Sequence, residues 1–338
     1  MRFMFGFVAL FATSGVVGGA KADAVADFYR GKSVTVSVGF SPGGGYDLHA
    51  RVLARHMGKH IPGEPRVSVR NLPGAAGLTL ANLLYNTAPQ DGTEFGTFDR
   101  SIPIDPLIGA GKSQFDALKF NWIGSTSNEI STCIAWNTAP VKTLDDVFQT
   151  ELVISGTAPS ANVVIYPRLM NELLGTKFKI VSGYPGSTEG LMAMERGETQ
   201  GFCAFGWSGL KSLHPDWLSE KKVNVLVQFG FEKDKDYPSV PLILDYAKTP
   251  KARQAIELVI APQLFARPFV APPNVPKERV AALRDAFAKT MGDPAYLEEA
   301  QKLNLEVELV KGQDVEDLIK RVYATPAETV DLVRAALQ

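Results

Sequence analysis

An α/β fold with mostly parallel sheets is predicted by three features of this sequence. Short apolar stretches typical of buried strands alternate with stretches whose apolar residues recur every three or four positions, as in helices. Glycine-rich segments join several of these strands directly to the following helix. The pattern also starts afresh after residue 120, and 338 residues are enough for two lobes of ordinary size.

The first set of elements lies before residue 100. The expected elements are a strand over 34–40, a helix from 47 to about 60, a strand over 67–69, a helix through 81–85 and a strand over 94–98. Asp47 is the expected N-cap of the first of these helices. Pro62-Gly63 and Asp91-Gly92 are typical turn pairs and separate the elements.

A second set of elements follows residue 120. The expected order is a strand over 122–124, a strand over 133–136, a helix from 144, a strand over 152–155, a helix ending at 174, a strand over 178–180, a helix ending at 196, and strands over 201–205 and 223–229. Thr143 and Asp146 have the spacing of a capping box, in which each side chain accepts a backbone N–H. Gly175 is a typical helix C-terminus.

The C-terminal third is interrupted by prolines and is expected to close with three helices. One starts near Pro276 and ends at Gly292, and another starts at Asp293-Pro294. The last begins with Thr325-Pro326-Ala327-Glu328, which has the pattern of a capping box with proline at the first helical position.

The N-terminus has the pattern of a secretion signal. Arg2 precedes an almost wholly apolar segment over 3–12, and Ala22 and Ala24 each complete an A-x-A cleavage pattern. The apolar core is too short to span a bilayer as a permanent helix. We therefore expect a signal peptide over residues 1–22, cleaved near Ala22 or Ala24, and a periplasmic mature protein.

Charge and composition exclude some partners. The sequence has 35 Lys and Arg against 36 Asp and Glu, with the charges interspersed. A nucleic-acid-binding protein would show a basic stripe, so no nucleic-acid partner is expected. Any bound anion must be held by a local site, because the net charge of −1 provides no attractive field.

The chain has two cysteines, Cys133 and Cys203. Export would permit a disulfide between them. The sequence does not show whether they lie within reach of one another, so the bonded and free states both stay open. Two cysteines alone cannot form a zinc site, and no metal or other cofactor is expected.

Four loops between strands and helices could bind an anion: 41–45, 73–77, 156–162 and 184–187. Free backbone N–H groups at a helix N-terminus attract negative charge. In open α/β sheets, ligands bind where strands end and helices begin. If two lobes face each other, the four loops surround one cleft. The alternative is that their glycines only make tight turns.

Two enzyme classes are approached by the sequence but not matched. Gly43 and Gly45 fit the first two glycines of the dinucleotide fingerprint G-x-G-x-x-G, but Leu48 stands at the third. Gly206-Trp207-Ser208-Gly209 approaches the nucleophile elbow of hydrolases, with its second glycine one residue early. An exported hydrolase that uses the same cleft remains the rival hypothesis.

Single side chains suggest further possibilities. Arg100 directly follows a strand, where a guanidinium could bind a carboxylate through two hydrogen bonds or could simply lie at the surface. His56 and His60 are spaced to share a metal, but the pattern H-E-x-x-H is absent and a solvated or partly covered helix face is the favoured explanation. Trp207, Phe205 and Tyr184 could form an apolar wall or part of the core.

Five segments together resemble one protein family, the Bug-type (TctC-like) extracytoplasmic solute receptors of tripartite tricarboxylate transporters. The segments are Phe40-Ser41-Pro42-Gly43-Gly44-Gly45-Tyr46-Asp47, Asn71-Leu72-Pro73-Gly74-Ala75-Ala76-Gly77, Ala88-Pro89-Gln90-Asp91-Gly92-Thr93, Tyr184-Pro185-Gly186-Ser187 and Ala271-Pro272-Pro273-Asn274-Val275-Pro276. Phe98-Asp99-Arg100 differs from the small polar residues usual in the family, and a buried Arg100 would alter the charge that the cleft prefers.

The resemblance implies a two-lobed periplasmic-binding-protein fold of type II, the Venus flytrap, with a small carboxylate bound between the lobes. It implies a monomer without catalytic activity that delivers its ligand to membrane transporter subunits. A ligand-sensing subunit for a signalling kinase is a further alternative. The expected lobes are 23–120 with 230–338, and 121–229.

The ligand-binding residues expected from the loops and the resemblance are Phe40, Ser41, Gly43, Gly44, Gly45, Asp47, Pro73, Gly74, Ala75, Arg100, Thr157, Ser160, Tyr184, Gly186, Ser187 and Trp207. The resemblance assigns the grip on one carboxylate to Ser41, Gly43, Gly44, Asp47, Tyr184, Gly186 and Ser187. The sequence does not identify which carboxylate is bound.

Overall fold

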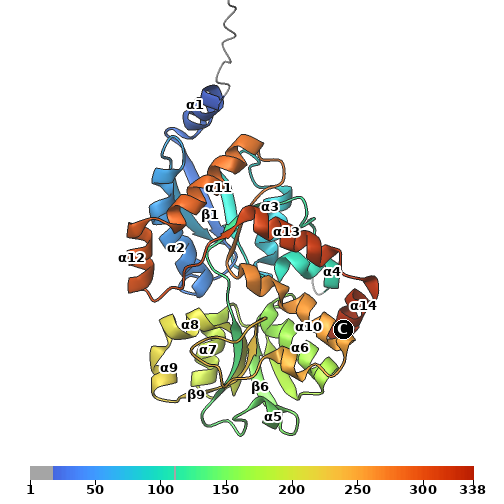
Figure 1. Cartoon of the computed structure of the whole chain (residues 1–338). Helices are drawn as coiled ribbons and strands as arrows, with labels where there is room; N and C mark the ends of the chain where they lie inside the picture. The colour runs from blue at the N-terminus through green and yellow to red at the C-terminus, as the bar shows by residue number, and fades with distance from the viewer. Residues whose placement is uncertain (1–17, 110–111) are drawn as a thin grey trace, which may run out of the picture.

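The computed structural model describes residues 18–109 and 112–338 and contains two β-sheets with helices on their faces. Figure 1 shows the two sheets in separate lobes, with the N-terminal and C-terminal colours mixed in one lobe and the middle of the chain in the other. The start of the predicted signal peptide and its apolar core lie outside the described residues. The expected two-lobed α/β fold is confirmed.

The first lobe is built on a six-stranded sheet of order β11-β4-β10-β3-β1-β2. Its strands are β1 (Ser33–Val38), β2 (Arg66–Asn71), β3 (Glu94–Thr97), β4 (Asn121–Ser125), β10 (Pro268–Ala271) and β11 (Val310–Lys311). β1, β2 and β3 are parallel, but β10 runs antiparallel to both β3 and β4. The sheet is therefore mixed, because β10 enters it from the other lobe.

The second lobe has a five-stranded sheet of order β7-β6-β8-β5-β9. Its strands are β5 (Ser131–Trp136), β6 (Leu152–Gly156), β7 (Phe178–Ser182), β8 (Gly201–Gly206) and β9 (Val223–Phe229). β6 is parallel to β7 and β8, whereas β5 is antiparallel to β8 and β9. Most strands of each sheet thus share one direction, as expected, and the exceptions include β5 and β10, which each follow a crossing between the lobes.

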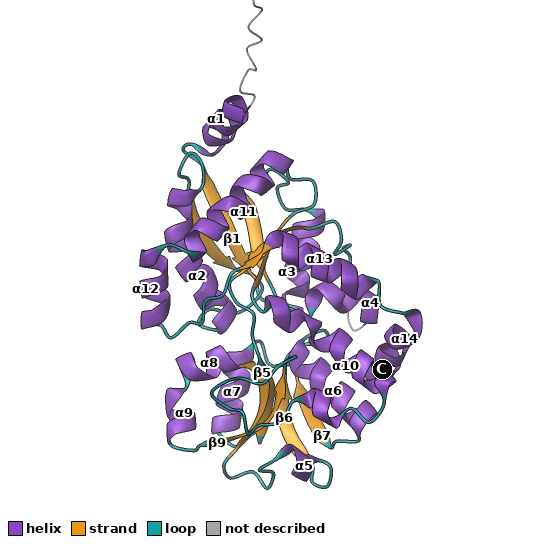
Figure 2. Ribbon diagram, in the orientation of Figure 1, coloured by secondary structure: helices purple, strands orange, loops and turns teal. Residues whose placement is uncertain are grey.

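Helices cover both sheets, as Figure 2 shows. In the first lobe they are α1 (Gly18–Tyr29), α2 (Gly45–Met57), α3 (Leu78–Asn86), α4 (Asp105–Ile108), α11 (Lys277–Met291), α12 (Pro294–Lys302) and α13 (Gly312–Tyr323). The others are α5 (Leu144–Val147), α6 (Asn162–Leu174), α7 (Ser187–Glu195), α8 (Trp207–Leu213), α9 (Pro215–Ser219), α10 (Pro250–Ile260) and α14 (Ala327–Leu337). Within the described residues, no helix combines the length and apolar character needed to cross a membrane.

Short 3₁₀ helices connect several of these elements. They are η1 (Gly58–His60), η2 (Ala75–Gly77), η3 (Ile102–Ile104), η4 (Ile243–Tyr246) and η5 (Ala261–Phe265).

Most helix termini follow the sequence signals, but three expectations are wrong. The capping box of Thr143 and Asp146 is present, and α6 ends at Gly175. The N-cap of α2 is Gly44 rather than Asp47. α14 starts at Ala327 after Pro326, without the expected capping box. Four helices close the chain rather than three, because α13 carries no strong start signal.

Two connecting segments run side by side between the lobes. Residues 126–130 lead from β4 to β5, and residues 261–267 return from α10 to β10. The backbone N–H of Glu129 donates to the carbonyl of Gln263 at 3.0 Å, and that of Ala266 donates to the carbonyl of Ser127 at 2.9 Å. These bonds join the two segments into one hinge.

The expected lobe boundaries need two corrections. β4 lies in the first sheet, so the chain leaves that lobe after Ser125 rather than after Phe120. α10 and α14 pack against α6 of the second lobe although the sequence placed 230–338 in the first, and Figure 1 shows them beside α6. The apolar face of a helix shows that the helix is covered, but not which sheet covers it. Sequence patterns therefore could not assign α10 and α14 to the correct lobe.

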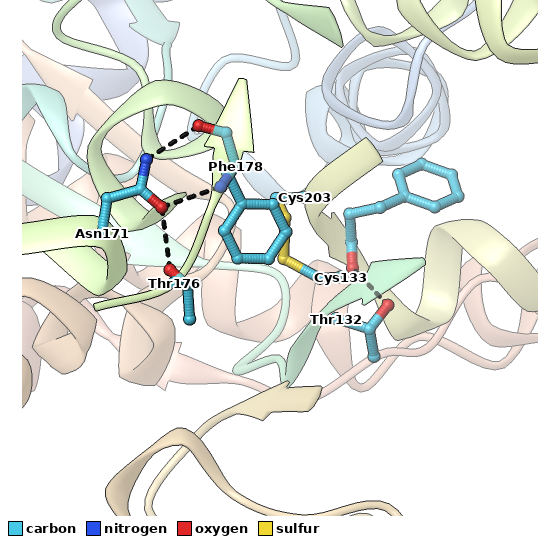
Figure 3. Close-up of a disulfide and its surroundings, with 7 residues drawn as sticks. Thr132, Cys133, Asn171, Thr176, Phe178 and Cys203 are labelled. Atoms are coloured by element: carbon cyan, nitrogen blue, oxygen red, sulfur yellow. Dashed lines mark hydrogen bonds between the residues drawn. A yellow bond between two sulfur atoms is a disulfide. The ribbon is translucent and has the colours of Figure 1, made fainter. Parts of the chain in front are cut away.

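The structure settles the cysteine question. Cys133 of β5 and Cys203 of β8 are joined by a disulfide between neighbouring strands, shown in Figure 3. Both residues are fully buried. Beside them, the side chain of Asn171 bonds the backbone N–H and carbonyl of Phe178 at 2.9 and 2.8 Å, which fixes α6 to β7.

The two histidines with metal-ligand spacing pair with carboxylates of α12 instead. His56 Nε2 lies 2.6 Å from Glu299 Oε2, and His60 Nε2 lies 2.7 Å from Asp293 Oδ2. The described part of the chain contains no cluster of three or more His, Cys, Asp or Glu residues that could hold a metal. These contacts hold α12 against α2.

Candidate ligand-binding site

A cavity of about 240 Å³ lies between the lobes and is lined by both. The first lobe and its hinge supply Phe40, Gly43, Gly44, Gly45, Tyr46, Asp99, Arg100 and Arg267. The second lobe supplies Thr157, Asn162, Val163, Ser187, Thr188, Leu191, Met192, Ala204, Phe205, Gly206, Gly209, Leu213 and His214. The N-termini of α2, α6 and α7 all contribute to this lining, as expected for glycine-rich loops that face one cleft.

The loop before α2 is held by Asp47, which does not itself line the cavity. Its carboxylate accepts the backbone N–H of Gly43 at 2.9 Å and the side-chain amide of Asn71 at 2.7 Å, and Arg51 Nε lies 2.8 Å away. Burial would raise the pKa of Asp47, but these hydrogen bonds hold it below its ordinary value. Gly43 has φ +90°, a conformation that favours glycine. Asp47 is therefore a support for the loop.

Arg100 faces the cavity and is almost fully buried, with 3 % of its surface exposed. It follows β3, and its backbone N–H donates to the hydroxyl of Tyr46 at 3.0 Å. Its Nη1 donates to Gln263 Oε1 and lies 3.8 Å from Glu129 Oε2. Its Nε and Nη2 make no hydrogen bond to any described residue. The guanidinium therefore has donor capacity to spare.

Arg267 is a second buried arginine in the same wall, with 5 % exposed, and the sequence reasoning missed it. Its Nη1 lies 2.7 Å from Glu129 Oε2, and its guanidinium lies 4.9 Å from the ring centre of Tyr46. Its Nη2 would lie 3.3 Å from a Cβ placed at Gly45, the first residue of α2. Arg267 thus adds its charge to the positive end of the α2 dipole.

Glu129 is the carboxylate that both arginines share. It is buried, and Ser208 donates to it through both its backbone N–H, at 3.0 Å, and its hydroxyl. Burial would raise the pKa of Glu129, but Arg267, Arg100 and the Ser208 hydroxyl lower it below its ordinary value. Glu129 is therefore ionised at neutral pH and offsets one of the two guanidinium charges.

His49 and Asp99 are two other titratable groups near the arginines. His49 is buried with Nδ1 3.0 Å from Thr126 Oγ1, and burial together with Arg267 lowers its pKa to about 3. Burial raises the pKa of Asp99, whose carboxylate accepts the backbone N–H of Ser101 at 2.8 Å. Arg100, Arg267 and Glu129 thus form one buried ion-paired group, and Asp99 is a further carboxyl of the cavity lining.

The second lobe contributes both hydroxyl groups and apolar side chains to the lining. Ser187 and Thr188 lie at the start of α7, and Thr188 Oγ1 would lie 3.9 Å from a Cβ placed at Gly44. The N-termini of α2 and α7 therefore face each other closely. The apolar part of the lining from this lobe includes Leu191, Met192, Phe205 and Leu213.

Several expected site residues lie at a second hollow of about 390 Å³. Pro73, Gly74, Ala75 and Tyr184 line it, and Thr157 belongs to both cavities. The loops 73–77 and 184–187 therefore approach each other across a common hollow. That hollow adjoins the cavity that contains Arg100 and Arg267 but is separate from it.

Five expected site residues line neither of these cavities: Ser41, Asp47, Ser160, Gly186 and Trp207. Trp207 is 2 % exposed and packs on Tyr237, with ring centres 4.4 Å apart, so it belongs to the core. Gly186 is the N-cap of α7, and Ser160 is buried. Phe40, Gly43, Gly44, Gly45, Arg100, Thr157 and Ser187 do line the main cavity.

Comparisons with known proteins agree with this architecture. No family model matches the sequence. A UPF0065 protein in the gbd 5′ region of Cupriavidus necator is 26 % identical over 327 residues, which cover 94 % of this chain and 90 % of that protein. The periplasmic binding protein BugD superposes with a TM-score of 0.72 at 17 % identity, over 91 % of this chain and 98 % of BugD.

A third relative was solved with a ligand. MatC (Rpa3494) from Rhodopseudomonas palustris with bound malate superposes with a TM-score of 0.70 at 20 % identity, over 89 % of this chain and 99 % of MatC. The similarity thus extends over both lobes in each case. The resemblance to the Bug-type, TctC-like solute receptors is confirmed, and this chain has the two-lobed fold of those periplasmic binding proteins.

Proposed function

We propose that this protein is a periplasmic solute-binding protein that holds a small carboxylate between its lobes and delivers it to a membrane transporter of the tripartite tricarboxylate type. The observation that carries the proposal is the pair of buried guanidiniums of Arg100 and Arg267, which share the single carboxylate of Glu129 in a cavity between the lobes.

The charge balance favours an anionic ligand. Arg100 and Arg267 share one ionised carboxylate, that of Glu129, so this group of three side chains carries one positive charge. An uncompensated buried charge is costly unless it is paired and hydrogen-bonded. A ligand carboxylate would supply both the opposite charge and acceptors for the free Nη2 groups, since planar guanidinium and carboxylate groups pair well.

The position of the site between two lobes supports a receptor. A ligand that contacts both lobes binds the closed arrangement better than an open one and so favours closure. The hinge segments 126–130 and 261–267 carry Glu129 and Arg267, so the arginine that would bind the ligand and the carboxylate that pairs with it lie where the lobes pivot. The malate-bound relative and the periplasmic BugD are consistent with this role and location.

The proposal contains no catalytic step. Ser208, the residue nearest to a hydrolase nucleophile in the sequence, donates its hydroxyl to Glu129 and is 2 % exposed. A hydrolase would need that hydroxyl open to its substrate, but Ser208 does not line the cavity. The proposed protein therefore releases its ligand unchanged.

Isothermal titration calorimetry with a panel of small carboxylates tests the proposal. Wild-type protein should bind at least one of them, and Arg267→Met should weaken that binding about tenfold or more because a charge-assisted contact is lost. Arg253→Gln is the matched control, since Arg253 pairs with Glu257 at the surface, away from the cavity. Circular dichroism checks that each variant is folded.

Mass spectrometry of the recovered ligand completes the test. A ligand returned intact is expected. Turnover of the ligand, or binding that Arg267→Met leaves unchanged, would contradict the proposed function.

A further inference from the structure

We propose that the cavity between the lobes binds a proton together with the ligand carboxylate, and that Asp99 is the residue that holds this proton. The proposal rests on the proposed function, because it concerns the ligand of the same site. The observation behind it is that two buried carboxyl groups, those of Asp99 and Glu129, accompany the two buried guanidiniums.

Asp99 is a buried carboxyl group of the cavity lining. It is 4 % exposed and directly precedes Arg100 in the chain. Its Oδ1 accepts the backbone N–H of Ser101 at 2.8 Å. Within the described residues, Arg100 and Arg267 form their ion pairs with Glu129, and no ion pair is formed with Asp99. Asp99 therefore lines the site without the ion pair that would keep a buried carboxyl charged.

The titratable groups that face Asp99 come from four segments. Arg100 of its own segment and Arg267 of the hinge favour its charged form. Tyr46 of α2 and Tyr166 of α6 also lie within electrostatic reach, but burial raises the pKa of both hydroxyls, so they stay neutral. Burial of Asp99 outweighs the two arginines and raises the pKa of its carboxyl above the ordinary value. Asp99 can therefore take up a proton at a pH at which exposed carboxyls are ionised.

Glu129 is the weaker proton acceptor of the two carboxyls. Arg267 Nη1 lies 2.7 Å from its Oε2, and Ser208 donates to it through both its backbone N–H and its hydroxyl. These partners, together with Arg100, lower the pKa of Glu129. When surroundings shift the pKa values of two carboxyls in opposite directions, one stays charged and the other holds the proton. The proton is therefore assigned to Asp99.

The balance of charge explains why a carboxylate would bring a proton with it. If Asp99 is ionised, it and Glu129 balance the two guanidiniums, and a ligand carboxylate would be a third anion facing two cations. An unbalanced buried charge is strongly unfavourable. If Asp99 is protonated, the ligand carboxylate restores the balance. Binding of the anion and binding of the proton therefore favour each other.

The other polar groups of the site do not change this balance at neutral pH. Asn162 and Thr157 belong to the lining but carry no charge, and Thr157 Oγ1 has no hydrogen-bond partner among the described residues. Burial lowers the pKa of His214, which also lines the cavity, and holds that of His49, near the arginines, at about 3. Both imidazoles are therefore neutral, which leaves Asp99 as the group that gains the proton.

Calorimetry over a range of pH tests the proposal. Malate, adipate and benzoate are titrated into wild-type protein between pH 6.5 and pH 9.5, where their carboxylates are ionised, and the acid that binds most tightly is the probe. Its affinity should fall about tenfold per pH unit wherever the free protein loses a proton that the complex retains. Titrations in buffers of different ionisation enthalpy should show uptake of about one proton per bound probe in that range. Affinity that is independent of pH, without proton uptake, would overturn the proposal.

Asp99→Asn assigns the proton to its residue. The amide keeps an oxygen that can accept the N–H of Ser101 but cannot ionise. We expect its binding to be independent of pH, without proton uptake, and about tenfold or more tighter than that of the wild type at pH 9.5. The matched control is Asp105→Asn, because Asp105 is also a buried carboxyl with a raised pKa but does not line the cavity. It should keep the wild-type pH dependence.

Two further outcomes separate the possible failures. Proton uptake that persists in folded Asp99→Asn, or that disappears in His214→Gln, would assign the proton to another group and overturn the proposal while leaving the receptor function intact. The second variant keeps the assignment testable if Asp99→Asn does not fold. If folded wild-type protein binds no small carboxylate at any pH, the proposed function itself fails.

Discussion

Nη1 of Arg267 lies 2.7 Å from Oε2 of Glu129, and these two residues belong to the two antiparallel connections between the lobes. The ion pair therefore joins the hinge segments to each other at the edge of the cavity. It also fixes one guanidinium of the cavity in place before a ligand arrives. Rigid placement of binding groups reduces the entropy that binding must overcome.

The first prediction concerns the stability of this pair. Glu129→Gln should lower the free energy of unfolding by about 3 kcal/mol, because it leaves Arg267 and Arg100 buried without a counter-charge. Urea unfolding followed by circular dichroism measures the change. Glu257→Gln, which removes the partner of exposed Arg253, should change stability by less than about 1 kcal/mol. Equal effects of the two substitutions would show that Glu129 does not balance the arginines.

The second prediction concerns the pH dependence of stability. Burial, with a further contribution from Arg267, lowers the pKa of His49 to about 3, whereas the unfolded chain takes up this proton near pH 6.5. Below pH 6.5 the unfolded state binds more protons, so stability falls as the pH falls, by up to about 1.4 kcal/mol per pH unit from this group.

The His49→Gln variant isolates that contribution. Between pH 6.5 and pH 4 its stability should fall less steeply than that of the wild type, while other groups contribute equally to both proteins. Parallel pH profiles would mean that His49 titrates normally and is not buried as the structure shows.

The third prediction concerns the loop before α2. A side chain at Gly44 would point toward Thr188 across the cavity, and Gly44 has ordinary extended backbone angles, so Gly44→Val should fold normally. It should weaken carboxylate binding about tenfold or more because the methyl groups displace the anion from the N-terminus of α2. Ser41→Val, in the same loop but outside the cavity lining, should bind as the wild type does. The loop assignment is wrong if calorimetry finds the opposite order.

The fourth prediction concerns the disulfide. A thiol titration of unfolded, unreduced protein should find no free thiol from Cys133 and Cys203. The bond closes a loop with a sequence separation of 70, so the double substitution of both cysteines by alanine should lower stability by about 4 kcal/mol in the chain-entropy model. Two free thiols, or unchanged stability, would contradict the pairing.

The fifth prediction concerns an ion-pair contact between the lobes outside the cavity lining. Lys211 of α8 pairs with Glu306, which precedes β11 of the first lobe, and with Asp236 at 3.1 Å. Glu306→Gln should shift ligand-free protein toward a more open form, because it removes an ion pair that holds the lobes together. The shift should be small, since one partly exposed ion pair contributes about 1 kcal/mol or less. Small-angle scattering should then give a larger radius of gyration than that of Asp317→Gln, a surface control. An identical radius in both variants removes this contact from the account of closure.

Local signals in the sequence predicted most strands and several helix ends because they depend on neighbouring residues. β9 (Val223–Phe229) has the predicted bounds, and the capping box of Thr143 is present. Strand direction was harder, because β10 and β5 follow crossings between lobes and run antiparallel to their neighbours. Periodicity along a segment carries no information about the direction from which the segment enters its sheet.

The site was only partly predictable for the same reason. Gly43, Gly44 and Arg100 stand at the end of a strand, where local sequence indicates a binding loop, and all three line the cavity. Arg267 lies in a proline-rich connection far along the chain, and only the packing of the two hinge segments brings it beside Gly45. Trp207 was expected in the site but belongs to the core. An aromatic residue next to a loop is often a core residue, and the sequence alone does not distinguish the two cases.

A crystal structure of the protein with a bound carboxylate tests the central claim most directly. The account predicts one ligand carboxylate within about 3 Å of nitrogen atoms from both Arg100 and Arg267. A carboxylate bound elsewhere in the cleft, with both guanidiniums contacting only Glu129, Gln263 and water, would contradict it.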